Sequence, residues 1–202
     1  MKKITIMLGV MALAATSFAQ GTVNFNNVPS QLITTNNGSG ITGSALGTVG
    51  SYYYGLFIAP VGTTSSNVLS GPWQFTGVYG TNTASAGRLS GGPGTGVSVP
   101  GWAGGTEMNF MLAGWSTSLG HDWSTVSAAL AGNGSGHFGQ SIIGDGLSGG
   151  GALGQPVLAL FGAAGNGAIQ GFVLNPVGVP EPATFALAGL GAAAMLIFRR
   201  RK

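Results

Sequence analysis

Residues 51–59 read Ser-Tyr-Tyr-Tyr-Gly-Leu-Phe-Ile-Ala, and this stretch decides the fold class. A continuous aromatic and apolar run of this length is typical of a β-strand that is covered on both faces. Residues 156–162 (PVLALFG) have the same character, and residues 168–174 (AIQGFVL), before Pro176, are expected to form the last strand.

Three other segments alternate between apolar and polar residues, which predicts strands buried on one face only. They are residues 22–26 (TVNFN), 73–79 (WQFTGVY) and 107–112 (EMNFML). The apolar positions are Val23 and Phe25 in the first, Trp73, Phe75 and Tyr79 in the second, and Met108, Phe110 and Leu112 in the third.

Glycine accounts for 39 of the 202 residues, so the chain is rich in turns and poor in long helices. Four Asn-Gly or Asp-Gly pairs predict tight turns, at 37–38, 133–134, 145–146 and 166–167. Residues 87–96 and 144–154 are expected to be long glycine-rich loops.

One short helix is expected over residues 123–131, capped by Asp122 and ended by Gly132, with Trp123, Val126 and Leu130 on one face. Short strands separated by turn signals favour a mainly β domain, either a sandwich or a jelly-roll-like fold, spanning residues 20–178.

Charged residues are scarce in the middle of the chain, which limits the functions that it can have. Between Gln20 and Val179 they are Arg88, Glu107, Asp122 and Asp145, so the basic balance of the whole chain, +3, belongs to its ends. A segment with one cation cannot neutralise a run of phosphates, which argues against nucleic acid as a partner.

No enzymatic role and no cofactor are expected. Cysteine is absent, and His121 and His137 are the only histidines, without metal-ligand spacing or a serine elbow. Several G-x-G-x-x-G matches lack the strand and helix that a nucleotide site requires.

Aromatic residues allow one binding hypothesis. Four tryptophans and three consecutive tyrosines offer rings that either pack in the core or stack on sugars. Trp102, in the Pro/Gly-rich stretch VPGWAGG, is the expected exposed candidate for a glycan contact.

The first 19 residues predict a signal peptide. Lys2 and Lys3 precede an apolar run over residues 4–15, and Ser17 and Ala19 are the small residues that signal peptidase prefers, which places cleavage between Ala19 and Gln20. The apolar run is shorter than the roughly 20 residues of a spanning helix.

The other end of the chain has three parts in order. Val179-Pro180-Glu181-Pro182 is followed by an uncharged stretch over residues 183–198 and then by Arg199, Arg200, Arg201 and Lys202. At about 1.5 Å per residue the stretch forms a marginal transmembrane helix of about 24 Å. The four cations act as a stop-transfer signal and hold that end in the cytoplasm.

This tripartite tail, residues 179–202, resembles the PEP-CTERM protein-sorting signal. The resemblance implies recognition of Pro180, Glu181 and Pro182 by an exosortase, a membrane enzyme that removes the tail and releases the protein to the cell surface or matrix. The stretch GTVNFNN, residues 21–27, also resembles the start of PEP-CTERM proteins from verrucomicrobial and planctomycete-like bacteria.

These observations favour an exported, non-enzymatic surface or matrix protein, anchored in the inner membrane only before processing. A polar surface with little charge suits exopolysaccharide as a partner. Two alternatives stay open: a surface-displayed carbohydrate-binding module, and a protein anchored permanently by its tail.

Overall fold

The computed structural model describes residues 20–178, apart from residues 39, 41, 133 and 152, and also residue 190. The expected signal helix over residues 1–19 and the expected transmembrane helix over residues 183–198 therefore lie outside the described residues, Leu190 excepted. Every structural statement below concerns the described part of the chain.

Strands dominate that part, with one short α-helix, as the composition and patterning predict. The strands are β1 (Gln20–Asn24), β2 (Thr34–Asn36), β3 (Thr42–Ser44), β4 (Tyr52–Ala59), β5 (Gln74–Asn82), β6 (Leu89–Ser90), β7 (Val97–Ala103), β8 (Glu107–Ser116), β9 (Gly136–Gln140), β10 (Gly144–Leu147), β11 (Leu158–Ala159) and β12 (Val173–Val177). A 3₁₀ turn, η1 (Thr117–Leu119), precedes helix α2 (Trp123–Ala131).

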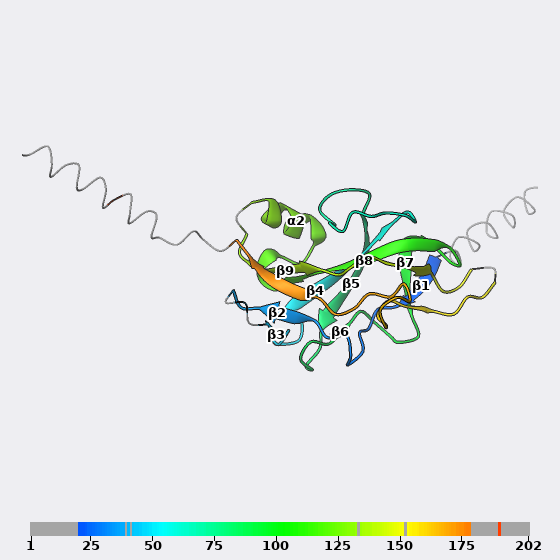
Figure 1. Ribbon diagram of the computed structural model, residues 1–202, viewed down its shortest axis with the longest axis horizontal. Coiled ribbons are helices and arrows are strands. Elements are labelled where there is room, and N and C mark those ends of the chain that lie inside the picture. Colours follow the sequence, from blue (N-terminus) through cyan, green and yellow to red (C-terminus); the bar gives the residue numbers. More distant parts are fainter. Residues whose placement is uncertain are drawn as a thin grey trace, which may run out of the picture.

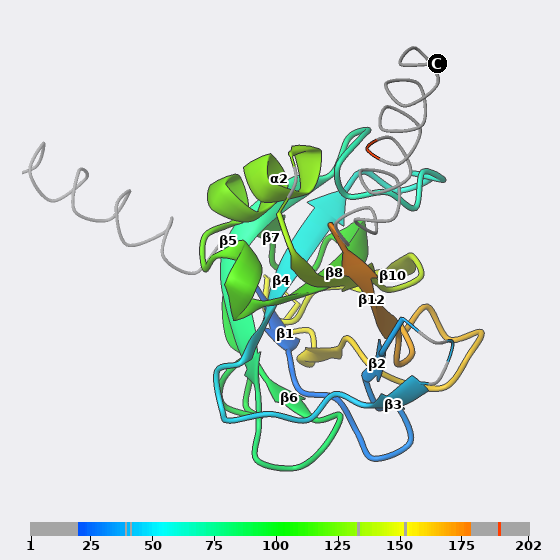
Figure 2. The same ribbon diagram turned by 90° about the vertical axis from the view of Figure 1, so that its left-hand side faces the viewer.

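The strands form two sheets. The larger sheet has the order β3-β2-β12-β9-β8-β4-β5-β6, and β10 pairs with β8 beyond the end of β9. The smaller sheet has the order β11-β1-β7. The large sheet is curled (Figures 1 and 2). Helix α2 lies on one side of it, and its own outer strands β2, β3 and β6, together with β1 of the smaller sheet, lie toward the other side.

Strand β4 pairs along its whole length with residues 109–116 of β8 at the centre of the large sheet. Residues 51–59 are covered on both faces, as predicted: Tyr54, Leu56 and Ile58 point to one side, and Phe57 to the other. The half-buried interpretation of residues 107–112 is wrong, because Met111 is as fully buried as Phe110 and Leu112 on the opposite face.

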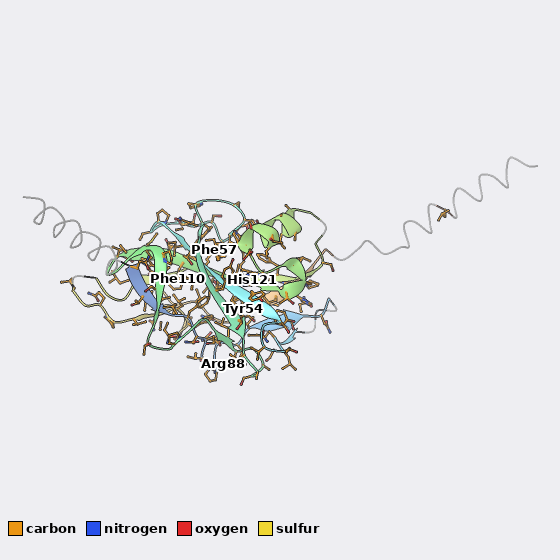
Figure 3. The ribbon with its side chains drawn as sticks, turned by 180° about the vertical axis from the view of Figure 1, so that it is seen from behind. Tyr54, Phe57, Arg88, Phe110 and His121 are labelled. Atoms are coloured by element: carbon orange, nitrogen blue, oxygen red, sulfur yellow. The ribbon has the colours of Figure 1, made fainter. Side chains whose placement is uncertain are left out.

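Two hydrophobic clusters fill the two sides of this sheet. The inner cluster lies between the two sheets and includes Val23, Tyr54, Trp102 and Phe110. The outer cluster lies under α2 and includes Phe57, Trp115 and Val126, with Trp123 packed against it. Figure 3 labels residues of both clusters. The second cluster explains why the central strands are apolar on both faces.

Tyr54 pairs with a glycine on each neighbouring strand, and one of these, Gly114, makes room for its ring. Tyr54 pairs with Gly80 of β5 and with Gly114 of β8, and Gly114 pairs with Gly139 of β9. A Cβ at Gly114 would lie 2.8 Å from the Tyr54 ring and 2.9 Å from Leu174. Gly114 lies within a strand and makes room for a large ring, which is a role that turn propensity does not predict.

The expected helix is present with the predicted bounds, and Val126 is fully buried under it. The capping prediction is wrong in one respect: Asp122 occupies the N-cap position, but its side chain makes no cap hydrogen bond. Its carboxylate contacts the ring of His121 instead.

Other local expectations need correction. The segment 156–162 contributes only the short strand β11, and the last strand begins at Val173, later than expected. The two predicted loops contain β6 and β10, so Asp145-Gly146 lies in a strand instead of a turn. Gly38 and Gly167 do have the positive φ angles of turns.

Candidate functional site

The predicted sorting residues lie outside the described part of the chain. These are Ala19 at the signal-peptide cleavage site, Val179, Pro180, Glu181 and Pro182 of the motif, and Arg199, Arg200, Arg201 and Lys202 of the basic end. Among the described residues, no helix has the length and apolar character needed to cross a bilayer. The assignments of these residues therefore stay predictions.

The boundary next to the sorting motif is well defined. Strand β12 pairs with β2 through Val173 and Leu174, and with β9 through Asn175, Pro176 and Val177. Leu174 is fully buried in the inner cluster. The chain is thus held in the sheet as far as Val177.

Gly178 then takes a left-handed conformation, with φ +62°, and a Cβ there would collide with the carbonyl oxygen of Gly134. Only glycine fits both conditions, since it alone lacks a Cβ. The last strand therefore ends at Val177, and Gly178 alone lies between it and Val179, the first residue of the predicted sorting segment.

The start of the described part also lies directly beside a predicted processing site. Strand β1 begins at Gln20, the residue after the predicted cleavage site, and lies between β7 and β11. Gly21 packs against the Ser148 side chain so closely that a Cβ would overlap it. Gln20 is exposed, whereas Val23 is fully buried.

Trp102 is not exposed, and that expectation is wrong. It lies in β7, only 1% of it is accessible, and its ring packs 5.9 Å from that of Phe110. Its indole Nε1 donates a hydrogen bond to the Thr106 carbonyl at 2.9 Å. The Pro/Gly-rich sequence around it suggested a loop, but β7 contains both Pro100 and Gly101. In this position the ring offers no face to a sugar.

The remaining large aromatics also pack in clusters. Trp115 is fully buried, and Trp123 lies 4.7 Å from Phe57 in an edge-to-face contact. Tyr79 and Tyr53 reach the rim of the outer cluster, where both contact the ring of His121. Core packing accounts for the buried tryptophans.

His121 and Asp122 form the one contact between a histidine and a carboxylate among the described residues. Nδ1 of His121 and Oδ1 of Asp122 are 2.8 Å apart, and the two side chains are 55% and 70% exposed. No described hydroxyl bonds to the His121 ring, so the pair lacks the nucleophile of a catalytic triad. Nε2 of His137 contacts the Asn36 carbonyl.

Acidic and histidine side chains do not gather elsewhere either. Among the described residues, no group of three or more His, Asp and Glu could hold a metal ion. Burial, with a smaller contribution from the neighbouring Tyr52, raises the pKa of the Tyr54 phenol far above its ordinary value. That phenol lies inside the inner cluster.

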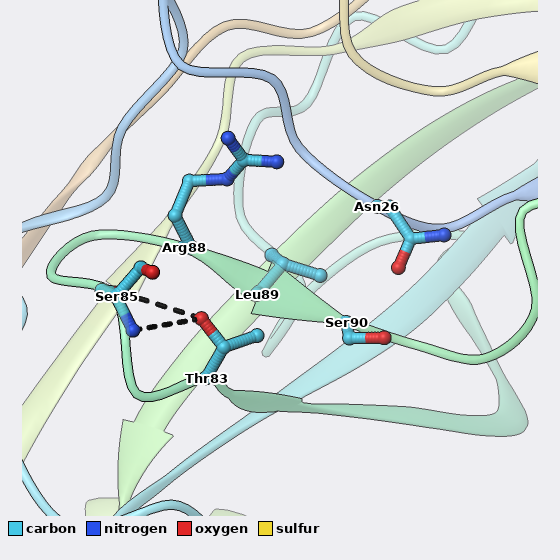
Figure 4. Close-up of a pocket in the computed structure, with 6 residues that line it drawn as sticks. All are labelled: Asn26, Thr83, Ser85, Arg88, Leu89 and Ser90. Carbon is cyan, nitrogen blue, oxygen red and sulfur yellow. Dashed lines mark hydrogen bonds between the residues drawn. The ribbon is translucent and has the colours of Figure 1, made fainter.

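An open pocket of about 360 Å³ lies beside β6 (Figure 4), on the opposite side of the molecule from α2 (Figure 1). Sequence reasoning did not identify it, although Arg88, the only cation between Gln20 and Val179, was a usable signal. The other residues that line it are Asn26, Thr83, Ser85, Leu89 and Ser90.

Asn27 holds Arg88 in place. Nε of Arg88 donates to the Asn27 side-chain oxygen at 3.1 Å, and Nη2 donates to the Asn27 carbonyl. The buried Asn27 amide donates to the carbonyls of Gln31 and Gly87, both at 2.8 Å. Its side-chain oxygen also accepts from Leu89 N at 2.9 Å, so every polar atom of this side chain is used.

Comparison with protein families gives one match. The PEP-CTERM protein-sorting motif matches residues 178–202, a stretch that begins at the residue after β12. A search of curated proteins and of solved structures finds no significant match to this chain.

The matched motif supports a PEP-CTERM protein that is exported through exosortase-type sorting and directed to the cell surface. It implies an exosortase as a processing partner. The match covers the tail and leaves the role of the β domain to be argued from the domain itself.

Proposed function

We propose that this chain is an exosortase substrate whose tail delivers a non-enzymatic β domain, residues 20–178, to the cell surface or extracellular matrix. One observation carries the proposal: the last strand ends at Val177 and the matched motif begins at residue 178. Removal of the tail after that point takes away no described strand.

The proposed route has three steps. Signal peptidase cleaves between Ala19 and Gln20, residues 183–198 anchor the chain in the inner membrane, and the four terminal cations stay in the cytoplasm. Exosortase then recognises Pro180, Glu181 and Pro182. Pro180 and Pro182 support this step because proline keeps the residue before it extended, and an extended peptide is accessible to a protease.

The described domain supports a role without catalysis. Its three carboxylates and two histidines are spread over the structure, and only His121 and Asp122 touch. A sandwich, or a jelly-roll-like variant of it, is the proposed architecture, and the inner cluster between the two sheets supports it. The proposed relationship to verrucomicrobial and planctomycete-type proteins rests on residues 21–27 alone.

The test is the intact mass of the protein recovered from its producing cells, with terminal peptides mapped by mass spectrometry. We expect a mature chain that begins at Gln20 and has lost Arg199 to Lys202. Retention of those cations would identify a permanently tail-anchored membrane protein and would refute processing.

A pair of variants makes the test specific. Glu181→Gln removes the carboxylate of the motif and should leave the tail attached. Glu107→Gln makes the same change at an exposed position of β8 and should be processed normally. Equal processing of the two variants would count against recognition of Glu181.

A further inference from the structure

The pocket beside Arg88 combines one fixed cation with several polar side chains. Arg88, Leu89 and Ser90 lie at β6, and Thr83 and Ser85 lie in the turn between β5 and β6. Asn26, just after β1, forms the remaining wall and pairs with Ser90 through a β-bridge. The pocket therefore lies where the two sheets meet.

The guanidinium of Arg88 has unused binding capacity. Nε and Nη2 bond to Asn27, which fixes the orientation of the group, but Nη1 has no hydrogen-bond partner in the described part of the chain. No described carboxylate lies within ion-pair distance of Arg88. A cation that is fixed by neutral groups, without an acidic partner, favours a ligand that brings its own negative charge.

The other side chains in the pocket suit a polyhydroxylated ligand. The hydroxyls of Ser85 and Ser90 have no hydrogen-bond partner among the described residues, and the Thr83 hydroxyl bonds only within its own turn. The side-chain oxygen of Asn26 is also unused, since its bonds are made by the amide nitrogen. Hydroxyls and amides of this kind recognise sugar hydroxyls as both donors and acceptors.

We infer that this pocket binds a carboxylate-bearing sugar, such as a uronate residue of an acidic polysaccharide, with Arg88 on the carboxylate and Thr83, Ser85, Ser90 and Asn26 on the hydroxyls. The volume of about 360 Å³ is at the lower end of the range for small-ligand sites. The inference rests on the proposed function, because export is what brings the domain to extracellular polysaccharide.

The test is isothermal titration calorimetry with the protein as it is recovered from its producing cells. Three probes are compared: trigalacturonate, the neutral trisaccharide maltotriose, and acetate at the same carboxylate concentration. We expect trigalacturonate to bind about tenfold more tightly than either of the others, since only it combines the charge with the hydroxyls. Equal binding of acetate would reduce the pocket to a plain anion site, and equal binding of maltotriose would remove the role of the charge. Either result, or no binding of trigalacturonate, would overturn the inference.

Variants assign the binding to this pocket. Arg88→Gln keeps a donor for Asn27 and removes the charge, so trigalacturonate binding should be lost while maltotriose is unaffected. Because Arg88 also supports the fold, a second variant changes only free hydroxyls: Ser85→Ala with Ser90→Ala should weaken trigalacturonate binding several-fold. Ser70→Ala, at an exposed serine in the loop after β4, is the matched control. Undiminished binding in the Ser85/Ser90 double variant would place the sugar elsewhere and refute the assignment.

Failure of this inference is distinguishable from failure of the proposed function. Tail removal is read from the intact mass and involves none of the pocket residues. Sugar binding is read from the calorimeter with whichever processed form the cells produce. An intact tail with sugar binding, or a removed tail without it, would each contradict one proposal and leave the other standing.

Discussion

Replacing Tyr54 by phenylalanine should stabilise the protein. The Tyr54 side chain is fully buried in the inner cluster, and its hydroxyl is the one buried side-chain polar atom in the described part of the chain that has no hydrogen-bond partner. A buried polar group without a partner costs about 1–3 kcal/mol, because the bonds that it made to water are not replaced. Tyr54→Phe removes this cost and keeps the ring.

A small opposing contribution comes from the void that the oxygen leaves. An empty volume of about 15 Å³, at about 24 cal/mol per Å³, costs about 0.4 kcal/mol. We therefore expect the free energy of unfolding to rise by about 1–2 kcal/mol, measured by urea denaturation at neutral pH. Tyr53→Phe is the control: Tyr53 is the neighbouring residue on β4, is partly exposed, and should change stability by less than about 0.5 kcal/mol.

Alkaline pH gives a second readout of the same group. Burial raises the pKa of Tyr54 above its ordinary value near 10, so the unfolded chain loses this proton first. The stability linked to Tyr54 is fully present below about pH 10 and is lost as the pH rises above it, by about 1.4 kcal/mol per pH unit. Tyr54→Phe should remove that slope. A loss of 1 kcal/mol or more in Tyr54→Phe at neutral pH would instead show that the hydroxyl has a partner, such as a buried water.

Three further substitutions test the packing by urea or thermal unfolding. Asn27→Ala removes the four hydrogen bonds of a buried side chain and should cost about 3 kcal/mol; a cost below about 1 kcal/mol would contradict the assigned network. Gly139→Ala places a Cβ against the Val173 carbonyl and should cost about 2 kcal/mol, whereas Gly94→Ala, in open space, should be nearly neutral. Asp122→Ala should cost only a few tenths of a kcal/mol because its carboxylate does not cap α2; a cost of about 1 kcal/mol would show that it does cap.

Local patterns predicted the elements that depend on local interactions. Residues 51–59 and 123–131 combine a run of the right length with clear flanking signals, and both form the expected element. The second covered face of β8 was not predictable in the same way. Met111 takes the position that a polar residue would have in a half-buried strand. It is buried by the outer cluster, whose residues come from other elements, including β4 and α2.

Glycine and proline misled the sequence interpretation for a physical reason. Their backbone preferences predict turns, but a glycine within a sheet is selected by what lies next to it: Gly114 by the Tyr54 ring, and Gly139 by the close approach of β12. Trp102 was assigned to a loop from its Pro/Gly neighbours, although Pro100 is compatible with β7, which pairs along one edge with β1. Side-chain neighbours of this kind are known only after the strands are paired.

Of the two candidate sites, the sorting tail is predictable from the sequence and the Arg88 pocket is not. The sorting tail is a linear motif, so its residues can be read in order from the chain. The Arg88 pocket joins residues from both sides of a gap of more than fifty positions, between Asn26 and Thr83, and Asn27 gives no local sign of its role in orienting Arg88.

The glycine that ends the last strand has a consequence for how such a chain can evolve. Because β12 ends at Val177 and the matched motif begins at Gly178, the sorting tail and the β domain are adjacent in the chain and share no described strand. Recombination at that junction can attach the same sorting signal to an unrelated domain, or this domain to a different sorting signal, without any change to a hydrophobic core.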